Sequence, residues 1–140
     1  MRLRIITPME VVVDEDGVQA LRAEDASGGF GILPHHADFL TSLVISVVGW
    51  KRHDGTRHFC AVRRGVLTVS EGQQIVIATR EAVVGDDLVT LDEIVLGRFR
   101  ADAETERTER TEGRRLELNA IRQIMHHLRE DRHGGSRVFP

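Results

Sequence analysis

The chain has 140 residues, of which 41% are hydrophobic and 29% charged, and its formal net charge is -3. This composition predicts a globular domain with at most a small appendage, and it excludes a disordered chain. The acidic balance argues against a general nucleic-acid binder, which carries a basic excess. The one cysteine, Cys60, excludes an intrachain disulfide and indicates a reducing compartment, where we expect its thiol to be a small buried hydrophobe.

Neither a signal peptide nor a membrane span is expected. Residues 1–13 contain arginine and proline within what would have to be the apolar region of a leader. The longest apolar stretch, at residues 43–50, is far shorter than the roughly 20 residues that cross a bilayer. We therefore expect a soluble protein, or one that is held at a membrane only through its partners.

Up to about Val84 the chain has the signals of β-structure. Apolar or β-branched runs lie at residues 2–6, 11–13, 18–25, 39–50, 57–63, 66–70 and 75–84. Turns are predicted between them, and His53–Thr56 carries the Asp-Gly pair of a tight hairpin. Short strands separated by turns at intervals of about ten residues predict a β-sandwich or a barrel.

From about Asp86 the pattern becomes helical. Asp86 and Asp87 are suited to cap a helix. Its apolar residues follow a helical spacing at Leu88, Leu91, Val95 and Phe99. A second helix is predicted at residues 114–132, where Leu118, Ile121, Met125 and Leu128 step by three and four.

The segment between the two predicted helices has no apolar residue. Its sequence, TERTERTE at residues 105–112, is followed by Gly113. We interpret it as the solvated end of the first helix and the bend of a helical hairpin. A charged linker is the alternative.

Residues 28–39, GGFGILPHHADF, form the most unusual segment of the chain. His35 and His36 are adjacent, so on an extended chain they point to opposite sides, and a zinc site needs at least three protein ligands. The glycines are not followed by a helix or by a phosphate-loop lysine, since the only lysine is Lys51. No serine lies in a nucleophile elbow. We therefore expect no catalytic residue, no metal and no cofactor.

The backbone shape of this segment suggests a contact with another protein. Its glycines allow close approach of another backbone, and Pro34 stiffens the turn beside the large apolar residues Phe30, Leu33 and Phe39. These features suit an exposed protein-binding loop at the rim of a sandwich. The alternative is an ordinary bulged strand pair whose phenylalanines belong to the core.

Three stretches of the chain resemble a known family. GGFGILPHHADFLTSL is similar to the signature G-x-x-G-I/V-x-P-x-H-A-x-x-L-T-x-L of the epsilon subunit of rotary F-type ATP synthases. RRGVLTVSEGQQIVIATREAVVGDDL and LRIITPMEVVVDEDGVQALRAEDASGGFG are similar to other parts of the same family, in the same order. The resemblance covers residues 2–88. It implies an N-terminal β-sandwich of about ten strands at residues 1–86 and a C-terminal two-helix antiparallel hairpin at residues 87–140.

The resemblance also implies a role. It places the chain in the central stalk of the enzyme as a non-catalytic rotor subunit, attached to the gamma subunit and the c-ring. Its C-terminal helices, when extended, would contact the alpha and beta subunits and inhibit hydrolysis. The protein would lie on the cytoplasmic face of the bacterial inner membrane, touching the membrane only through the complex. An independent cytosolic β-sandwich that binds other proteins is the competing hypothesis.

The family pattern assigns an interface to the glycine-rich segment. It implies contact with the c-ring or the gamma subunit for Gly29, Phe30, Gly31, Leu33, Pro34 and His36. His35 stands where the family usually has a small residue, so it adds bulk and a titratable group at the same contact.

The C-terminal half is less like the family. Its ATP-binding motif L/I-D-x-x-R-A is matched by Leu91 and Asp92, but Val95 takes the place of the arginine and Arg98 comes three residues later. We therefore expect weak ATP binding or none. A regulatory role is expected for Arg115, Arg122 and Arg129, which are seven residues apart and line one helix edge. These differences from the family pattern are compatible with the divergent subset of these enzymes called N-ATPases.

Overall fold

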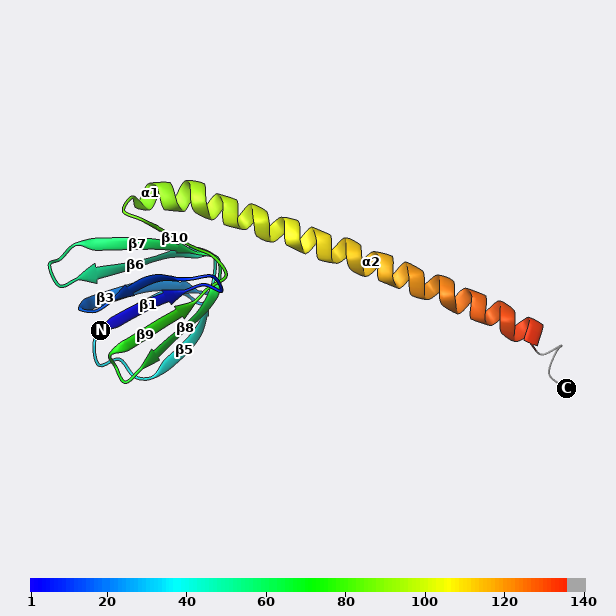
Figure 1. The fold of residues 1–140 in the computed structure, drawn as a ribbon, viewed down its shortest axis with the longest axis horizontal. Helices are drawn as coiled ribbons and strands as arrows, with labels where there is room; N and C mark the ends of the chain where they lie inside the picture. The colour runs from blue at the N-terminus through cyan, green and yellow to red at the C-terminus, as the bar shows by residue number, and fades with distance from the viewer. Residues whose placement is uncertain (136–140) are drawn as a thin grey trace. The chain divides into compact units, whose positions relative to one another are not determined.

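The computed structural model describes the backbone of residues 1–135, and the side chains of residues 1–126 and of Leu128. Within these residues, ten strands are followed by helical structure (Figure 1). The strands are β1 Arg2–Ile6, β2 Val11–Glu15, β3 Val18–Asp25, β4 Gly28–Ile32, β5 Phe39–Leu43, β6 Ser46–Arg52, β7 Arg57–Val62, β8 Gly65–Ser70, β9 Gln74–Ala78 and β10 Ala82–Gly85. The prediction of about ten strands is confirmed, and the glycine-rich segment contributes one of them.

The strands follow one hydrogen-bonded path that folds into two layers. Its order is β10-β7-β6-β3-β5-β8-β9-β1-β2, with β4 paired to β3 outside this path. All pairs are antiparallel except β1 with β9. The long apolar run that was predicted at residues 39–50 divides into β5 and β6, which pair with different parts of β3: Leu43 of β5 lies opposite Asp25, whereas β6 pairs with residues 18–22.

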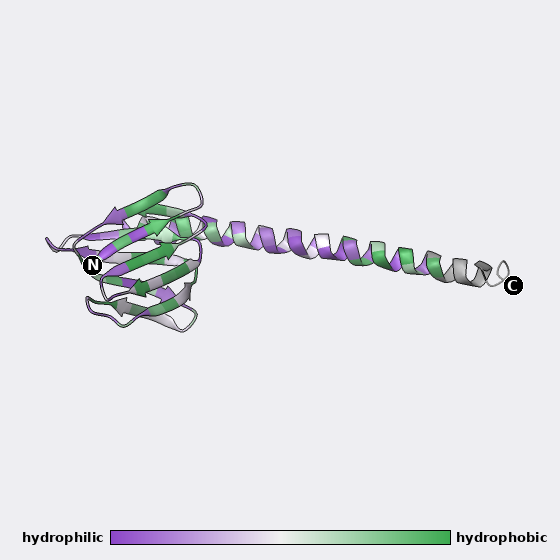
Figure 2. Ribbon diagram, turned by 60° about the horizontal axis from the view of Figure 1, so that its bottom comes forward, coloured by the Kyte–Doolittle hydropathy of each residue, from purple (hydrophilic) through white to green (hydrophobic). Residues whose placement is uncertain are grey.

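Alternation along the strands builds the core between the layers (Figure 2). The inward residues of β6 are Ser46, Val48 and Trp50, all buried, while the intervening residues face outward. Cys60 is buried opposite Val48, as expected, and burial raises the pKa of its thiol to about 12.

A polar link joins β2 to β6. Glu15 of β2 accepts hydrogen bonds from the Trp50 indole at 3.1 Å and from the Arg52 Nε at 2.8 Å, both on β6. The Arg52 guanidinium, followed by the Trp50 N–H, holds the pKa of the Glu15 carboxyl below its usual range. The buried Trp50 N–H thus has its acceptor, and β2 is tied to β6.

Helical structure begins where the sequence predicts it. Asp87 is the N-cap, with its carboxylate accepting from the Val89 amide at 3.0 Å and from the Thr90 hydroxyl at 2.7 Å. The helix α1 (Leu88–Thr90), the π-helical turn η1 (Leu91–Val95) and the helix α2 (Leu96–Gly135) follow without a break in helical backbone.

The first helical turns cover part of the outer face of the sheet. Leu91, Leu96 and Phe99 are buried against a second apolar cluster, separate from the core between the layers. The strand residues of this cluster are Ile45, Val47, Phe59, Ala61 and Val83. The predicted helical spacing of apolar residues is therefore confirmed at Leu91 and Phe99, which are buried, whereas Leu88 remains exposed.

The C-terminal half differs from the predicted hairpin, because α2 continues through Gly113 as a single helix. The threonines of the TERTERTE segment fit a helix, since Thr105, Thr108 and Thr111 each donate to the carbonyl four residues earlier at 2.9–3.0 Å. A lone glycine costs only about 1 kcal/mol in a helix. Without a proline or a second turn residue, Gly113 does not end it.

The chain forms two compact units, residues 1–100 and 101–140. The change in sequence pattern at residue 86 precedes this division by about four helical turns. Residues 88–100 are helical, yet they belong with the sandwich because their apolar side chains pack on it. The second unit has no packed apolar cluster among its described residues.

Removal of the Phe99 ring is expected to loosen the helix start. Phe99→Ala should lower the free energy of unfolding by about 3–5 kcal/mol, because it removes a fully buried aromatic side chain. Urea denaturation followed by Trp50 fluorescence measures the change. Ile94→Ala is the matched control, because Ile94 lies one turn earlier with its side chain exposed. Equal losses in the two variants would contradict the packing described.

Candidate functional site

The strand β4 presents bare backbone on its outer side. It pairs with β3 so that Phe30 lies opposite Ala23, on the side of the core, while Gly29 and Gly31 face outward and are exposed. A Cβ built on either glycine would approach no atom of the chain closer than 3.8 Å. Packing among the described residues therefore does not require glycine at these two positions.

The aromatic residues of the segment pack beneath its exposed glycines. Phe30 and Phe39 are partly buried against the core and meet edge to face, with ring centroids 5.6 Å apart. His36 stacks edge-on against Phe39 at 5.7 Å, and its Nδ1 donates to the Ala37 carbonyl at 2.7 Å. Phe30 therefore has the core role that composition alone left open, and a substitution there would disturb packing as well as any contact.

The turn that follows β4 is held by the turn between β8 and β9. The His35 amide donates to the Gly72 carbonyl at 2.9 Å, and the Glu71 amide donates to the Asp38 carboxylate at 3.1 Å. His35 has φ = 67°, in the left-handed region where side chains are uncommon. The small residue expected at this position by resemblance fits this conformation better than histidine does.

Gly72 and Asp38 were not singled out by the sequence. Their role arises from two turns that are more than 30 residues apart in the chain and meet only in the folded sandwich. A Cβ on Gly72 would lie 2.7 Å from the His35 Cα, so the two backbones touch. The Glu-Gly pair at residues 71 and 72 indicates a turn, but nothing in it indicates the partner.

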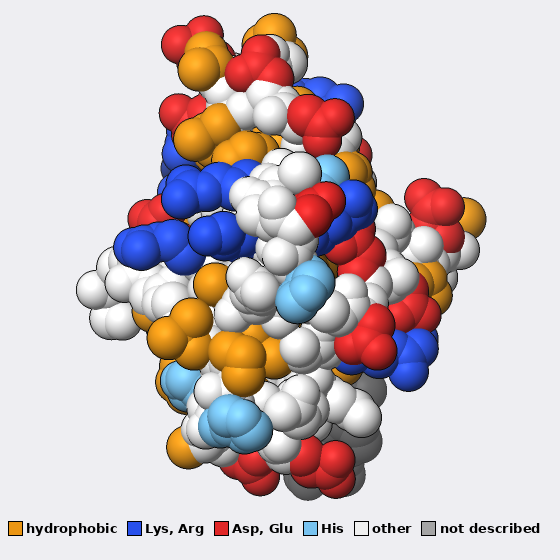
Figure 3. All heavy atoms as spheres, turned by 90° about the vertical axis from the view of Figure 1, so that its left-hand side faces the viewer, with side chains coloured by type: hydrophobic (Ala, Val, Ile, Leu, Met, Phe, Trp, Pro, Cys, Tyr) orange, Lys and Arg blue, Asp and Glu red, His pale blue; other side chains and the backbone are white. Residues whose placement is uncertain are grey.

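Exposed apolar side chains extend the site over the neighbouring strands. Leu33 is 63% exposed, Leu40 on β5 is 69% exposed, and Val66 on β8 is 41% exposed. The strands β5 and β8 are directly paired, so Leu40 and Val66 share the outer face of one layer. Pro34 and His35 are also exposed, beside Leu33. Figure 3 shows orange and pale-blue side chains together on the lower part of one face, below a band of lysine and arginine.

The predicted site residues thus divide into two groups. Those exposed on the surface are Gly29, Gly31, Leu33, Pro34 and His35, whereas Phe30 and His36 are half-buried beneath them. Among the described residues, no three His, Cys, Asp or Glu side chains are grouped so that they could hold a metal ion.

The arginines that the sequence predicts to be regulatory lie on the second unit. Arg115 and Arg122 are exposed on α2, and the side chain of Arg129 lies outside the described residues. The apolar seam of the same helix is more than half exposed at Leu118, Ile121, Met125 and Leu128. Arg98, the displaced arginine of the ATP motif, donates to Glu81 at 3.0 Å and lies over the Phe99 ring.

Comparisons with known proteins agree on one family. The family model described as "ATP synthase, Delta/Epsilon chain, beta-sandwich domain" matches residues 1–85. The "ATP synthase epsilon chain 2" of Cereibacter sphaeroides is 44% identical over 128 residues, which cover 91% of this chain and 88% of the relative. The "ATP synthase epsilon chain 2" of Paraburkholderia xenovorans is 47% identical over 133 residues, which cover 94% of this chain and 95% of the relative.

Two solved structures share the fold. One is a chain of the Euglena gracilis mitochondrial ATP synthase, OSCP/F1/c-ring, with a TM-score of 0.58 at 21% identity. The other is from the Tetrahymena thermophila mitochondrial ATP synthase, central stalk/c-ring, with a TM-score of 0.51 at 14% identity. The matches cover 76% and 59% of this chain, and 62% and 65% of the other chains, less than two thirds of their length.

Gly72→Ala is expected to distort the turn that carries His35. It forces a side chain into φ = 64° and against the His35 backbone, so the free energy of unfolding should fall by more than the roughly 1–2 kcal/mol of a left-handed residue alone. Gly55→Ala is the control, with φ = 87° and no atom within 4 Å. Urea denaturation and amide chemical shifts of His35 and Asp38 are the measurements. Equal losses, with unmoved shifts, would disprove the turn contact.

Proposed function

Because the chain belongs to the family of ATP synthase delta/epsilon chains, we propose that it is the epsilon subunit of the rotor of a rotary ATP synthase. The observation that carries this proposal is the alignment of nearly its whole length with two proteins named ATP synthase epsilon chain 2. Epsilon chains are structural and regulatory subunits rather than catalysts. The role of this chain is to couple ion movement through the c-ring to ATP synthesis and hydrolysis elsewhere in the complex.

Rotor attachment is assigned to the sandwich, with the gamma subunit and the c-ring as partners. The exposed Leu33 and Leu40 and the bare backbone at Gly29 and Gly31 support this assignment. An apolar patch can bury its surface only against another protein or a membrane. Glycine allows that protein to approach the strand backbone closely. His35 presents a polar group at the edge of the same surface.

The proposed location is the cytoplasmic face of the bacterial inner membrane. Among residues 1–135, no helix is long and apolar enough to cross a membrane. Contact with the membrane is therefore assigned to the c-ring, and this chain is peripheral.

Regulation is assigned to the helical segment that follows the sandwich, residues 87–140 in the proposed domain division. The helix α2 is about 60 Å long, at 1.5 Å per residue, and beyond residue 100 its described side chains are largely exposed. Its seam offers apolar surface to the alpha and beta subunits, and Arg115, Arg122 and Arg129 offer charges for carboxylates of the beta subunit. A folded hairpin would be the alternative, non-inhibiting state.

The rotor contact is tested with substitutions of exposed side chains. Leu33→Asp and Leu40→Asp should each weaken binding to a purified gamma–c-ring assembly at least about tenfold, because each would bury an unpaired charge. The control is Val89→Asp, since Val89 is similarly exposed on the first helical turn, where an acidic residue is favourable. Unchanged affinity in both leucine variants, with native circular dichroism, would remove this surface from the interface.

The regulatory role is tested by truncation after Arg100. This cut keeps Leu91, Leu96 and Phe99 on the sandwich, so the remaining unit retains its packed cluster. The assembled enzyme carrying the truncated chain should hydrolyse ATP faster than the enzyme with the full chain.

Replacing Arg115, Arg122 and Arg129 together with glutamine should give part of the same rise, and high salt should give a similar part. Arg110→Gln is the matched control, because Arg110 lies on a different side of the helix. An unchanged hydrolysis rate after truncation, in a coupled enzyme, would refute the regulatory role and leave the rotor role standing.

A further inference from the structure

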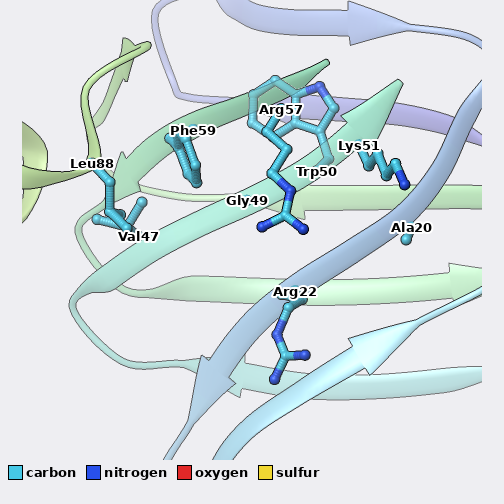
Figure 4. A pocket seen from close by; sticks show the side chains of 9 residues that line it. All are labelled: Ala20, Arg22, Val47, Gly49, Trp50, Lys51, Arg57, Phe59 and Leu88. Carbon is cyan, nitrogen blue, oxygen red and sulfur yellow. The ribbon is translucent and has the colours of Figure 1, made fainter. Parts of the chain in front are cut away.

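A groove lies on the outer face of β3, β6 and β7, and neither Leu33 nor Leu40 lines it. Its volume is about 470 Å³. The lining residues are Ala20, Arg22, Val47, Gly49, Trp50, Lys51, Arg57, Phe59 and Leu88 (Figure 4). All of them belong to the compact unit of residues 1–100.

Strand register explains why this face is hollow. Arg22 lies opposite Gly49, and Ala20 lies opposite Lys51. Gly49 of β6 and Ala20 of β3 therefore contribute two small residues to the floor of the groove. A Cβ on Gly49 would lie 3.2 Å from the Phe59 ring, which shows how closely the ring packs over this glycine. The Phe59 ring therefore covers the backbone at Gly49, and Ala20 adds only a methyl group to the same face.

The charged side of the groove is uncompensated. Arg22, Lys51 and Arg57 are exposed, and no described residue forms an ion pair with any of them. Lys51 and Arg57 are directly opposite across β6 and β7, an arrangement in which like charges are destabilising. Three unpaired cations lie together on one face of a chain with net charge -3, and they favour the binding of an anionic ligand there.

The other end of the groove is apolar. Val47 and Phe59 extend there from beneath the first helical turns, and Leu88 stands beside them with its side chain about half exposed. Figure 4 shows Leu88 and Val47 together at this end, while Arg22 and Lys51 lie away from it. A ligand that fills the groove therefore needs both an apolar group and negative charges.

From this arrangement we infer that the groove binds an acidic segment of a partner polypeptide. One large apolar side chain of that segment rests against Leu88 and Phe59, and carboxylates further along it pair with Arg57, Lys51 and Arg22. The cations arise from three adjacent strands about 4.8 Å apart, a spread that suits charges distributed along a peptide. This binding surface is additional to the rotor contact and does not depend on it.

Two other anionic ligands fit less well. A single phosphate group is bound by convergent backbone N–H groups or buried cations, whereas these three cations are exposed and spread over the sheet. An anionic membrane surface is broad and flat, so it could not enter a recess between side chains.

The inference is tested with the full chain and two synthetic peptides. One peptide carries a leucine followed by four glutamates, and the other carries the same leucine followed by four glutamines. Isotope-labelled protein titrated with the glutamate peptide should show amide shifts at Ala20 and Gly49, with no such shifts from the glutamine peptide. Raising the salt concentration should weaken the binding, because the cations are exposed.

Variants locate the binding. Lys51→Gln and Arg57→Gln should each weaken it about two- to fivefold, which corresponds to the loss of one exposed ion pair, and Leu88→Asp should weaken it further. Arg100→Gln is the control, because Arg100 is exposed in the same unit but does not line the groove. Native circular dichroism confirms the fold of each variant.

Two results would overturn the inference. One is equal affinity of the two peptides, or equal affinity of the Lys51, Arg57 and Arg100 variants for the glutamate peptide. The other is a shift of the Ala20 and Gly49 amides by pyrophosphate, or by vesicles containing phosphatidylserine, in the absence of a shift by the glutamate peptide. Loss of rotor binding with intact peptide binding would instead bear only on the proposed function.

Discussion

The outer face of β6, β7 and β10 is apolar at one end and cationic at the other. The apolar end decides where the first helical turns pack. Ala61, Phe59 and Val47 would lose favourable burial if they were left in water. The first helical turns cover them with Leu91, Leu96 and Phe99. The helix start is thus placed by apolar surface on strands 30 to 50 residues earlier in the chain.

Two other outer surfaces of the sandwich are exposed, and their chemistry differs. The groove beside Arg22, Lys51 and Arg57 is cationic with an apolar end, while the surface that includes Leu33 and Leu40 is apolar beside exposed backbone. A sandwich can carry such different surfaces because only the inward residues of each strand are committed to its core. The outward residues are then available for contacts with different partners.

Beyond residue 100 the helix has no apolar partner within the described chain. Its backbone hydrogen bonds hold the helix, and the threonine hydroxyls are satisfied by carbonyls four residues earlier, but neither decides what covers Leu118 and Ile121. A helix with an exposed apolar seam can exchange that exposure for contact with another protein or with itself. This freedom is what a regulatory segment with two conformations of similar free energy requires.

The sequence by itself determined the existence of most strands, the capped helix start at Asp87 and the buried state of Cys60. Each of these depends on local residue pattern and nearby turn chemistry. The tight turn at Asp54 and Gly55 belongs to the same class, since the Asp54 carboxylate accepts from the Thr56 amide at 3.0 Å. The family resemblance further depended on motifs that lie within single stretches of chain.

Only the tertiary structure decided how distant segments meet. The contact of Gly72 with His35, the link from Glu15 to Trp50 and the cationic groove each join strands or turns whose separation leaves no local signal. The hairpin was expected because a polar run and one glycine resemble a bend. A continuous helix formed instead, because a bend sacrifices backbone hydrogen bonds and Gly113 alone does not compensate for that loss.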